Sequence, residues 1–321
     1  MLGSQTNGPI GYAVDAIAIV GTLFGVAASL GYGSAQIVSG LHYVFDIAKG
    51  AQTQVIVIAL ITGVALASVL SGVNRGIKYL SELNMFIALI LLILVFILGP
   101  SIDLIYSFLY NLANYVQELP HLSLNPVGRE LNTWLGTWTL TYWGWWIAWA
   151  PFVGVFIARI SKGRTIKEFV LGVLLFPTIL TFLWMNVFGE QALNLAIADE
   201  VFKQTVLSDY TMAFFAFLES LPMTKVLSVV VISLICVFFV TSSDSGSLVI
   251  DMLASDGSEN PTKAQKTYWA LLEGAVAIVL VLSGGLATIQ SVSLNIAIPF
   301  CVVMLFMIWS LVRALKEESA N

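Results

Sequence analysis

The chain has 321 residues, of which 58% are apolar and 10% are charged, and its net charge at pH 7 is −5. A soluble domain of ordinary composition carries about a quarter charged residues, so this composition excludes a soluble globular protein. The two cysteines, Cys236 and Cys301, both stand inside apolar segments, and we expect free thiols rather than a disulfide framework.

Eight apolar segments are each long enough to cross a bilayer, whose hydrocarbon core of roughly 30 Å needs about 20 helical residues. The segments are continuous rather than alternating, which favours helices as the spanning structure. We therefore predict an all-α membrane protein with eight transmembrane helices. In chain order the segments are residues 13–45, 54–72, 83–100, 134–159, 166–188, 224–243, 265–285 and 291–312.

Small residues recur along the first span. Gly21, Gly25, Ser29 and Gly33 follow one another at four-residue spacing, which places them on one helix face. Such a face lets another helix approach closely, and we interpret it as a packing surface. The length of the span predicts a tilted helix, a break near residues 31–33, or both.

Two connections are longer than a simple turn between spans. Residues 101–118 carry apolar residues at helical spacing with polar residues between them. This pattern predicts an amphipathic helix that lies along the outer membrane surface. Residues 189–223 are acidic, and we expect an external loop there.

The fourth span contains the run WTLTYWGWWIAWAPF, residues 138–152, with five tryptophans and one tyrosine. Its first and last tryptophans are roughly 16 Å apart along a helix, which reaches about mid-membrane and is deeper than an interfacial aromatic belt. Gly144 and Pro151 are expected to weaken the helix, and unwound backbone at this depth would line a cavity. Five aromatic residues fall within about 100° of one helix face: Trp138, Tyr142, Trp145, Trp146 and Trp149.

An aromatic wall at mid-membrane suits a quaternary ammonium ion. This cation has no N–H to donate, and aromatic faces attract it by cation–π interaction, worth ~2 kcal/mol or more when desolvated. A primary ammonium ligand would call for carboxylates, and this helix has none. Two interpretations stay open, a site for a methylammonium ligand and simple packing combined with an interfacial belt.

The basic residues indicate an orientation. If the spans alternate, ten of the fourteen Lys and Arg residues fall on one side of the membrane, and only Lys49, Arg129, Lys203 and Lys225 fall on the other. The positive-inside rule assigns the richer side, with both termini, to the cytoplasm. Residues 159–167 belong to that side, and contact with anionic lipids is a plausible second role for them.

Several stretches resemble the betaine/choline/carnitine transporter family. They are WGWWIAWAPFVGVFIARISKGRTIKEF in the aromatic span, GTLFGVAASLGYGSAQI (21–37), GIKYLSELNMFIALILL (76–92) and FFVTSSDSGSLV (238–249). The resemblance covers nearly the whole chain. It implies a bacterial plasma-membrane secondary transporter of the leucine-transporter type, assembled as a homotrimer.

The resemblance also implies how the spans are organised. The family has twelve spans, and residues 1–321 align with the fifth to the twelfth, which implies an N-terminally truncated member. Residues 13–100 would be the last three helices of the first five-helix inverted repeat, which would lack its first two helices. Residues 134–315 would be the complete second repeat, and 316–321 a short cytoplasmic tail.

The family's binding residues carry over onto matching positions. The five aromatic residues on one face of the fourth span, together with Phe152, would form one wall of the substrate box. Sodium would be coordinated by Thr241, Ser242 and the carbonyl of Phe238, although the spacing alone favours local hydrogen bonds to the preceding turn. A second sodium position would use Thr22, but the residue one turn later, Val26, has no hydroxyl.

Two acidic residues, Asp244 and Glu273, lie within or at the end of apolar segments. For Asp244 we favour a structural role at a helix end over a proton relay, and we interpret Glu273 as an interhelical hydrogen-bonding group. His42 and His121 are isolated from each other and from both cysteines, and we predict no metal centre and no cofactor. Nothing in the composition indicates a nucleic-acid partner.

The leading hypothesis is sodium symport of a quaternary-ammonium compatible solute, with glycine betaine first. Choline or carnitine is the alternative solute. A membrane enzyme is disfavoured, since the chain has no G-x-S-x-G, no H-E-x-x-H and no nucleotide-binding loop. A truncated remnant that does not transport is the third hypothesis.

Overall fold

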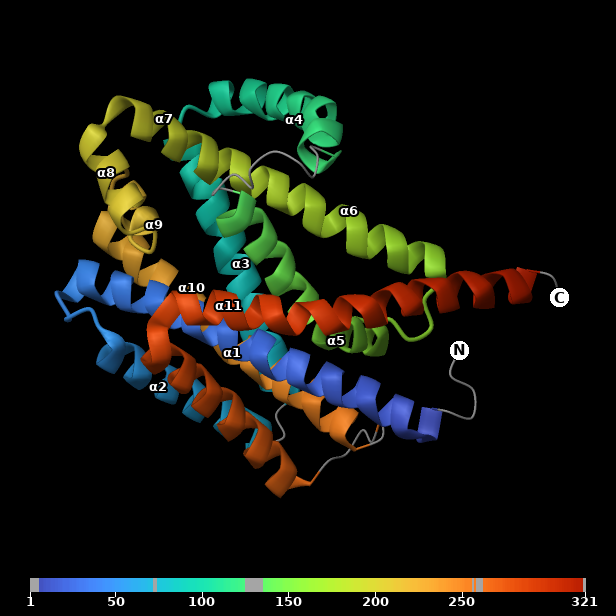
Figure 1. Ribbon diagram of the computed structural model, residues 1–321. Coiled ribbons are helices and arrows are strands. Elements are labelled where there is room, and N and C mark those ends of the chain that lie inside the picture. The colour runs from blue at the N-terminus through green and yellow to red at the C-terminus, as the bar shows by residue number, and fades with distance from the viewer. Residues whose placement is uncertain (1–5, 72–73, 125–134, 256, 258–261, 320–321) are drawn as a thin grey trace.

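The computed structural model describes residues 6–71, 74–124, 135–255, 257 and 262–319 of the chain. Within these ranges all of the regular structure is helical (Figure 1). The elements are α1 (Pro9–Phe45), α2 (Ala51–Ser71), α3 (Asn74–Leu98), α4 (Ser101–Leu124), the π-helical turn η2 (Leu135–Leu140), α5 (Thr141–Ile160), α6 (Ile166–Trp184), the π-helical turn η3 (Met185–Glu190), α7 (Gln191–Ala198), α8 (Glu200–Ser208), α9 (Ala213–Leu218), α10 (Thr224–Ala254) and α11 (Lys263–Ser319).

Seven helices in the described part of the chain are long and apolar enough to cross a membrane. The count differs from the predicted eight because the last of them, Lys263–Glu318, contains both of the last two predicted segments. The backbone of α11 leaves helical geometry at Gly284 and Gly285. Gly285 has φ 61° and ψ −140°, a conformation that residues with a side chain rarely adopt. Figure 1 shows the two arms of α11 meeting there in a sharp turn.

Helix α1 is the central packing element. It contacts α2, α5, α10 and α11, and most residues from Gly21 to Gly40 are buried. Of the two alternatives for this span, a tilt or a break near residues 31–33, the break is not found, since α1 is continuous for 37 residues. The predicted packing face is confirmed, because a Cβ atom at Gly33 would overlap the ring of Phe239. The glycines therefore allow α5 and α10 to lie directly against α1.

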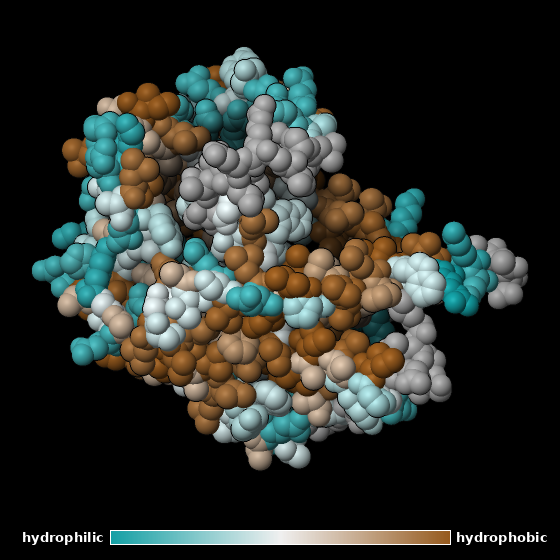
Figure 2. Space-filling model, in the orientation of Figure 1, coloured by the Kyte–Doolittle hydropathy of each residue, from teal (hydrophilic) through white to brown (hydrophobic). Residues whose placement is uncertain are grey.

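Other helices expose their apolar side chains. The apolar windows of α3 and α6 are only 17% and 11% buried inside the protein. In a bilayer such faces contact lipid, so their exposure agrees with the composition of the chain. Figure 2 shows apolar residues over much of the lower half of one face of the molecule, with many hydrophilic residues toward its margins.

Helix α4 forms where an amphipathic helix is predicted and extends beyond residue 118 to Leu124. It runs across the end of α3 in Figure 1 and is joined to η3 by Asn186, whose Nδ2 donates to the carbonyl of Leu104 at 2.8 Å. Its position on the outer membrane surface stays a prediction.

The expected loop at 189–223 is largely helical, because α7, α8 and α9 lie within it. Asp199 caps α8 by accepting from the backbone N–H groups of Val201 and Phe202. Lys49, which follows α1, donates to Asp209 at 2.7 Å and holds this segment against the α1–α2 connection. Burial raises the pKa of Asp209, but hydrogen bonds from Lys49 and Thr211 outweigh this effect and lower it overall.

Candidate functional site

The aromatic run lies on η2 and α5. The unwound backbone expected at Gly144 and Pro151 is not found, since α5 is continuous from Thr141 to Ile160 with Pro151 inside it. Gly144 instead permits a close helix contact, because a Cβ atom there would lie 2.5 Å from Leu294 Cδ2 in α11. The aromatic side chains are therefore placed by a regular helix packed between α1 and α11.

One group of these aromatic residues faces α1. Trp145 Nε1 donates to Ser29 Oγ at 3.2 Å, and Trp149 Nε1 donates to the carbonyl of Gly25 at 2.7 Å. The centroids of the two indole rings are 6.2 Å apart, with an interplanar angle of 70°. Phe152 continues the row at 5.3 Å from Trp149. We call Trp145, Trp149 and Phe152 the inner aromatic row.

The other predicted aromatic residues do not join the inner aromatic row. Tyr142 and Trp146 pair with each other at a centroid distance of 6.0 Å, and Trp138 instead contacts Tyr210 at 6.1 Å. The side chains of Trp138, Tyr142 and Trp146 are each about half exposed. The predicted single wall is therefore divided into an inner row against α1 and an outer, exposed group.

Sequence reasoning missed the α1 residues that hold the inner aromatic row. Tyr32 lies 5.4 Å from Trp145 between ring centroids, and Gly25 and Ser29 accept the two indole N–H groups. The small-residue pattern of the first span pointed to close packing here. It did not say which helix packs or that it brings indole rings, because spacing within one helix carries no information about its partner.

The first group of predicted sodium ligands lies on one turn of α10. Thr241 is half-buried, and its Oγ1 donates to the carbonyls of Val237 at 3.1 Å and Phe238 at 2.9 Å. These are the local hydrogen bonds that the spacing predicts. Ser242 is also half-buried. Three oxygens from one turn are fewer than the roughly six to eight that a hard cation such as Ca²⁺ takes, so a cation site at this turn would need further ligands from other elements.

The second predicted position, Thr22, is fully buried on α1. Its Oγ1 makes no hydrogen bond among the described residues, which is unusual for a buried hydroxyl. Val26, one turn later, packs against Gly246, where a Cβ atom would lie 2.7 Å from Val26 Cγ2. Thr22 therefore offers one free oxygen, and its neighbour on the helix offers none.

Two buried acids lie between α10 and its neighbours. Ser243 Oγ donates to Glu273 Oε2 at 3.1 Å, which confirms the predicted interhelical hydrogen bond of Glu273. Ser68 of α2 donates to Asp244 Oδ2 at 3.3 Å, as expected for a structural role of Asp244. In the part of the chain that the structure describes, no group of three His, Cys, Asp or Glu side chains is arranged to hold a metal ion.

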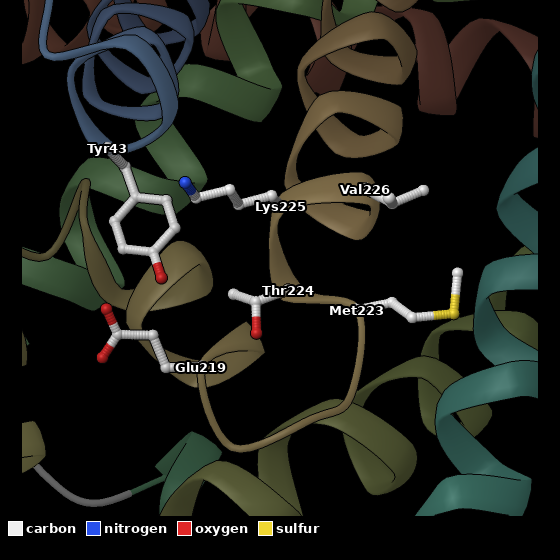
Figure 3. A pocket seen from close by; sticks show the side chains of 6 residues that line it. All are labelled: Tyr43, Glu219, Met223, Thr224, Lys225 and Val226. Atoms are coloured by element: carbon white, nitrogen blue, oxygen red, sulfur yellow. The ribbon is translucent and has the colours of Figure 1, made fainter.

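A separate cavity of about 600 Å³ opens where α1 ends and α10 begins. Figure 3 shows the hydroxyl of Tyr43 pointing toward Glu219 and the amine of Lys225 directed toward the Tyr43 ring. Met223 and Val226 point to the other side of α10. None of the predicted binding residues lines this cavity, so it does not belong to the aromatic site.

The sequence matches the betaine/carnitine/choline family transporter (BCCT) over residues 1–320. It is 44% identical over 320 residues to the glycine betaine transporter OpuD of Bacillus subtilis, covering 99% of this chain and 62% of the relative.

Two further relatives give the same picture. The chain is 40% identical over 323 residues to a glycine betaine transporter of Acinetobacter baylyi, with 100% of the chain and 49% of the relative covered. It is 42% identical over 318 residues to a glycine betaine/proline/choline transporter of Vibrio parahaemolyticus, with 99% and 57% covered. The chain therefore spans about half to three-fifths of the length of the curated relatives that it matches.

Proposed function

The chain belongs to the betaine/carnitine/choline transporter family, and we propose that it takes part in the sodium-coupled transport of glycine betaine across a bacterial plasma membrane. The family and the helical membrane fold make it a membrane transport protein rather than an enzyme. The solute and the coupling ion are the proposed parts.

The inner aromatic row supports the proposed quaternary-ammonium solute. Its two indole N–H groups are occupied by α1, so the indole rings have fixed orientations and offer a cation only their π faces. A trimethylammonium group has no N–H to donate and is bound by such faces. Glycine betaine is preferred because relatives with 40% to 44% identity carry its name. Choline is the second candidate, since one relative is named for betaine, proline and choline.

We extend the proposal to sodium through Thr241, Ser242 and the carbonyl of Phe238. The partial exposure of Thr241 and Ser242 supports it, because the Thr241 hydroxyl can offer a lone pair to a cation while it donates its local hydrogen bond. Thr22 is proposed as a second contact on the ground of its unpartnered buried hydroxyl.

The finer architecture is part of the same proposal. The turn at Gly284 and Gly285 lets the two arms of α11 cross the membrane separately, which gives eight crossings. Helices α5 to α11 would then form the second inverted repeat, with both termini cytoplasmic and a homotrimer as the assembly. Cysteines introduced at Lys162 and Ser208 should label from opposite sides of the membrane, and labelling from the same side would refute this topology.

The deciding experiment is a tryptophan-fluorescence titration with glycine betaine. It is run on the purified chain and on the chain joined to the N-terminal part of the B. subtilis relative, because the chain spans 62% of that relative. Each ring should contribute roughly 1–2 kcal/mol, so Trp145→Leu and Trp149→Leu should each weaken binding ~5- to 30-fold.

The matched control is Trp309→Leu, an exposed tryptophan near the end of α11. This variant should bind like the parent. If Trp145→Leu and Trp149→Leu also bind like the parent while all variants fold, the aromatic site is wrong. A loss of folded protein with unchanged affinity would indicate that the tryptophans serve packing alone.

A further inference from the structure

Glu273 is a fully buried acid on the first arm of α11. It follows the start of the arm by ten residues, roughly 15 Å along the helix, and therefore lies well inside the apolar segment. Its carboxyl is completely shielded from solvent within the protein. Oε2 accepts a hydrogen bond from Ser243, but Oε1 has no partner among the described residues.

Glu273 Oε1 lies near the hydroxyl of Ser247, which also has no hydrogen-bond partner among the described residues. Ser247, one turn beyond Ser243 on α10, is fully buried, and its Oγ lies on the Glu273 side without a hydrogen bond of good geometry. Gly246 brings α10 close, since a Cβ atom there would lie 3.4 Å from Glu273 Oε1. On the other side, the unpartnered hydroxyl of Thr62 in α2 lies against Gly274. Buried polar atoms are rarely left without partners, so a hydrogen bond between Glu273 Oε1 and Ser247 Oγ is the arrangement expected here.

The charges around Glu273 bear on whether its carboxyl is ionised. The groups that act on it electrostatically, Asp244 and Asp251, are acids on α10. Lys266 acts on these two acids, and Arg159 at the end of α5 is exposed and donates to Met252 Sδ. Val26 of α1 lies against Gly246, and α2 places the hydroxyl of Thr62 against Gly274 and that of Ser68 on Asp244.

No ion pair of Glu273 exists in the described part of the chain. An ionised carboxylate at this place would be buried, uncompensated and beside like charges, which is the most costly arrangement for an acid. A proton on Oε1 removes the charge. It also allows Oε1–H to donate to Ser247 Oγ, which gives both unpartnered atoms a hydrogen bond.

We propose that Glu273 is a proton-binding site in the contact between α10 and α11, with the proton held on Oε1 toward Ser247. The binding step adds one proton from water to the carboxylate and gives the neutral acid, with no redox change. The bound proton joins α11 to the turn of α10 that follows Ser242. This inference does not depend on which solute or ion the chain carries.

The test is infrared spectroscopy of the purified full chain, which detects the C=O stretch of a protonated carboxyl group. At neutral pH we expect a component of this band that is lost in Glu273→Gln and kept in Glu118→Gln, an exposed matched control on α4. An unchanged band in Glu273→Gln, or no band in the parent, would overturn the proposal. Loss of the band on addition of Na⁺ at constant pH would also overturn it, because the site would then hold a cation.

Two further measurements keep the test decisive. Glu273→Gln copies the shape of the neutral acid, so its thermal stability should change less between neutral and alkaline pH than that of the parent. Should Glu273→Gln fail to fold, Ser247→Ala replaces it. Removing the acceptor hydroxyl should shift the frequency of the same band without abolishing it, and an unshifted band would contradict the assigned hydrogen bond.

Discussion

The substitution Gly25→Ala tests whether α1 positions the inner aromatic row. A Cβ atom at Gly25 would lie 2.7 Å from Trp149 Cδ1 and 3.2 Å from the carbonyl oxygen of Ala148. The first distance is too short for a carbon–carbon contact, and the second involves backbone. Trp149 must therefore move, and its 2.7 Å hydrogen bond to the Gly25 carbonyl is then stretched or lost.

The expected cost follows from three contributions. Overpacking one methyl group costs about 1–3 kcal/mol, and losing the hydrogen bond costs about 0.5–1.5 kcal/mol. Alanine is a better helix former than glycine by about 0.5–1 kcal/mol, which offsets part of the loss. We expect Gly25→Ala to lower the free energy of unfolding by about 0.5–4 kcal/mol.

The assay is thermal unfolding in detergent, followed by circular dichroism and tryptophan emission. Gly154→Ala is the matched control, because Gly154 is an exposed glycine of α5 with open space around its Cβ direction. We expect the control to unfold at the parent temperature or slightly above it, and Gly25→Ala to unfold earlier. A Gly25→Ala protein that is as stable as Gly154→Ala would refute the packing of Trp149 on α1.

Three other predictions follow from single contacts. Thr241→Ala should raise the Na⁺ concentration needed for half-maximal uptake, whereas Ser233→Ala, which loses the same kind of local hydrogen bond on α10, should leave it unchanged; equal sodium dependence would exclude Thr241 as a ligand. Because the folded-state pKa of Asp209 is lowered, its contribution is complete above the unfolded pKa of about 3.9 and is lost as the pH falls through the lower folded value. Asp209→Asn should therefore lower the free energy of unfolding by roughly 0.2–1 kcal/mol at neutral pH. On acidification the stability of this variant should fall less than that of the parent, and identical acid unfolding curves for the two proteins would contradict this. Gly285→Ala should destabilise by about 1–3 kcal/mol, because φ 61° with ψ −140° strains any side chain, while Gly172→Ala, with open space at its Cβ, should be neutral; equal stability of the two would argue against the turn.

Sequence reasoning was sufficient for the long apolar helices but not for α7, α8 and α9, because only long apolar runs leave the backbone few alternatives in a membrane. It located α1, α2, α3 and α10 and the amphipathic helix α4. It could not exclude the breaks expected in α1 and α5, since a glycine or proline only permits a break. In the folded protein, Leu294 of α11 instead occupies the space beside Gly144, where a side chain would otherwise lie. The ring of Pro151 lies against Gly21 of α1.

The candidate site was predicted less completely than the fold. Helical spacing put five aromatic residues of the fourth span on one face, and this grouping ignored what each side chain meets. Trp145 and Trp149 donate hydrogen bonds to α1, whereas Trp146 makes a ring contact with Tyr142 and is half exposed. The separation depends on contacts 116 to 124 residues apart in the chain, which no local pattern contains.

Adjacent residues of α10 link the proposed ion site to the buried acid. Consecutive residues of a helix point about 100° apart, so Ser242 and Ser243 face different surroundings. Ser242 is half-buried on the side of the proposed sodium ligands, and Ser243 is fully buried and bonded to Glu273. A helix turn moves as one unit, since its backbone hydrogen bonds connect each residue to the next turn. A cation that shifts this turn of α10 would therefore also move the serine that holds Glu273, so Na⁺ should shift the frequency of the Glu273 band while the proton stays bound.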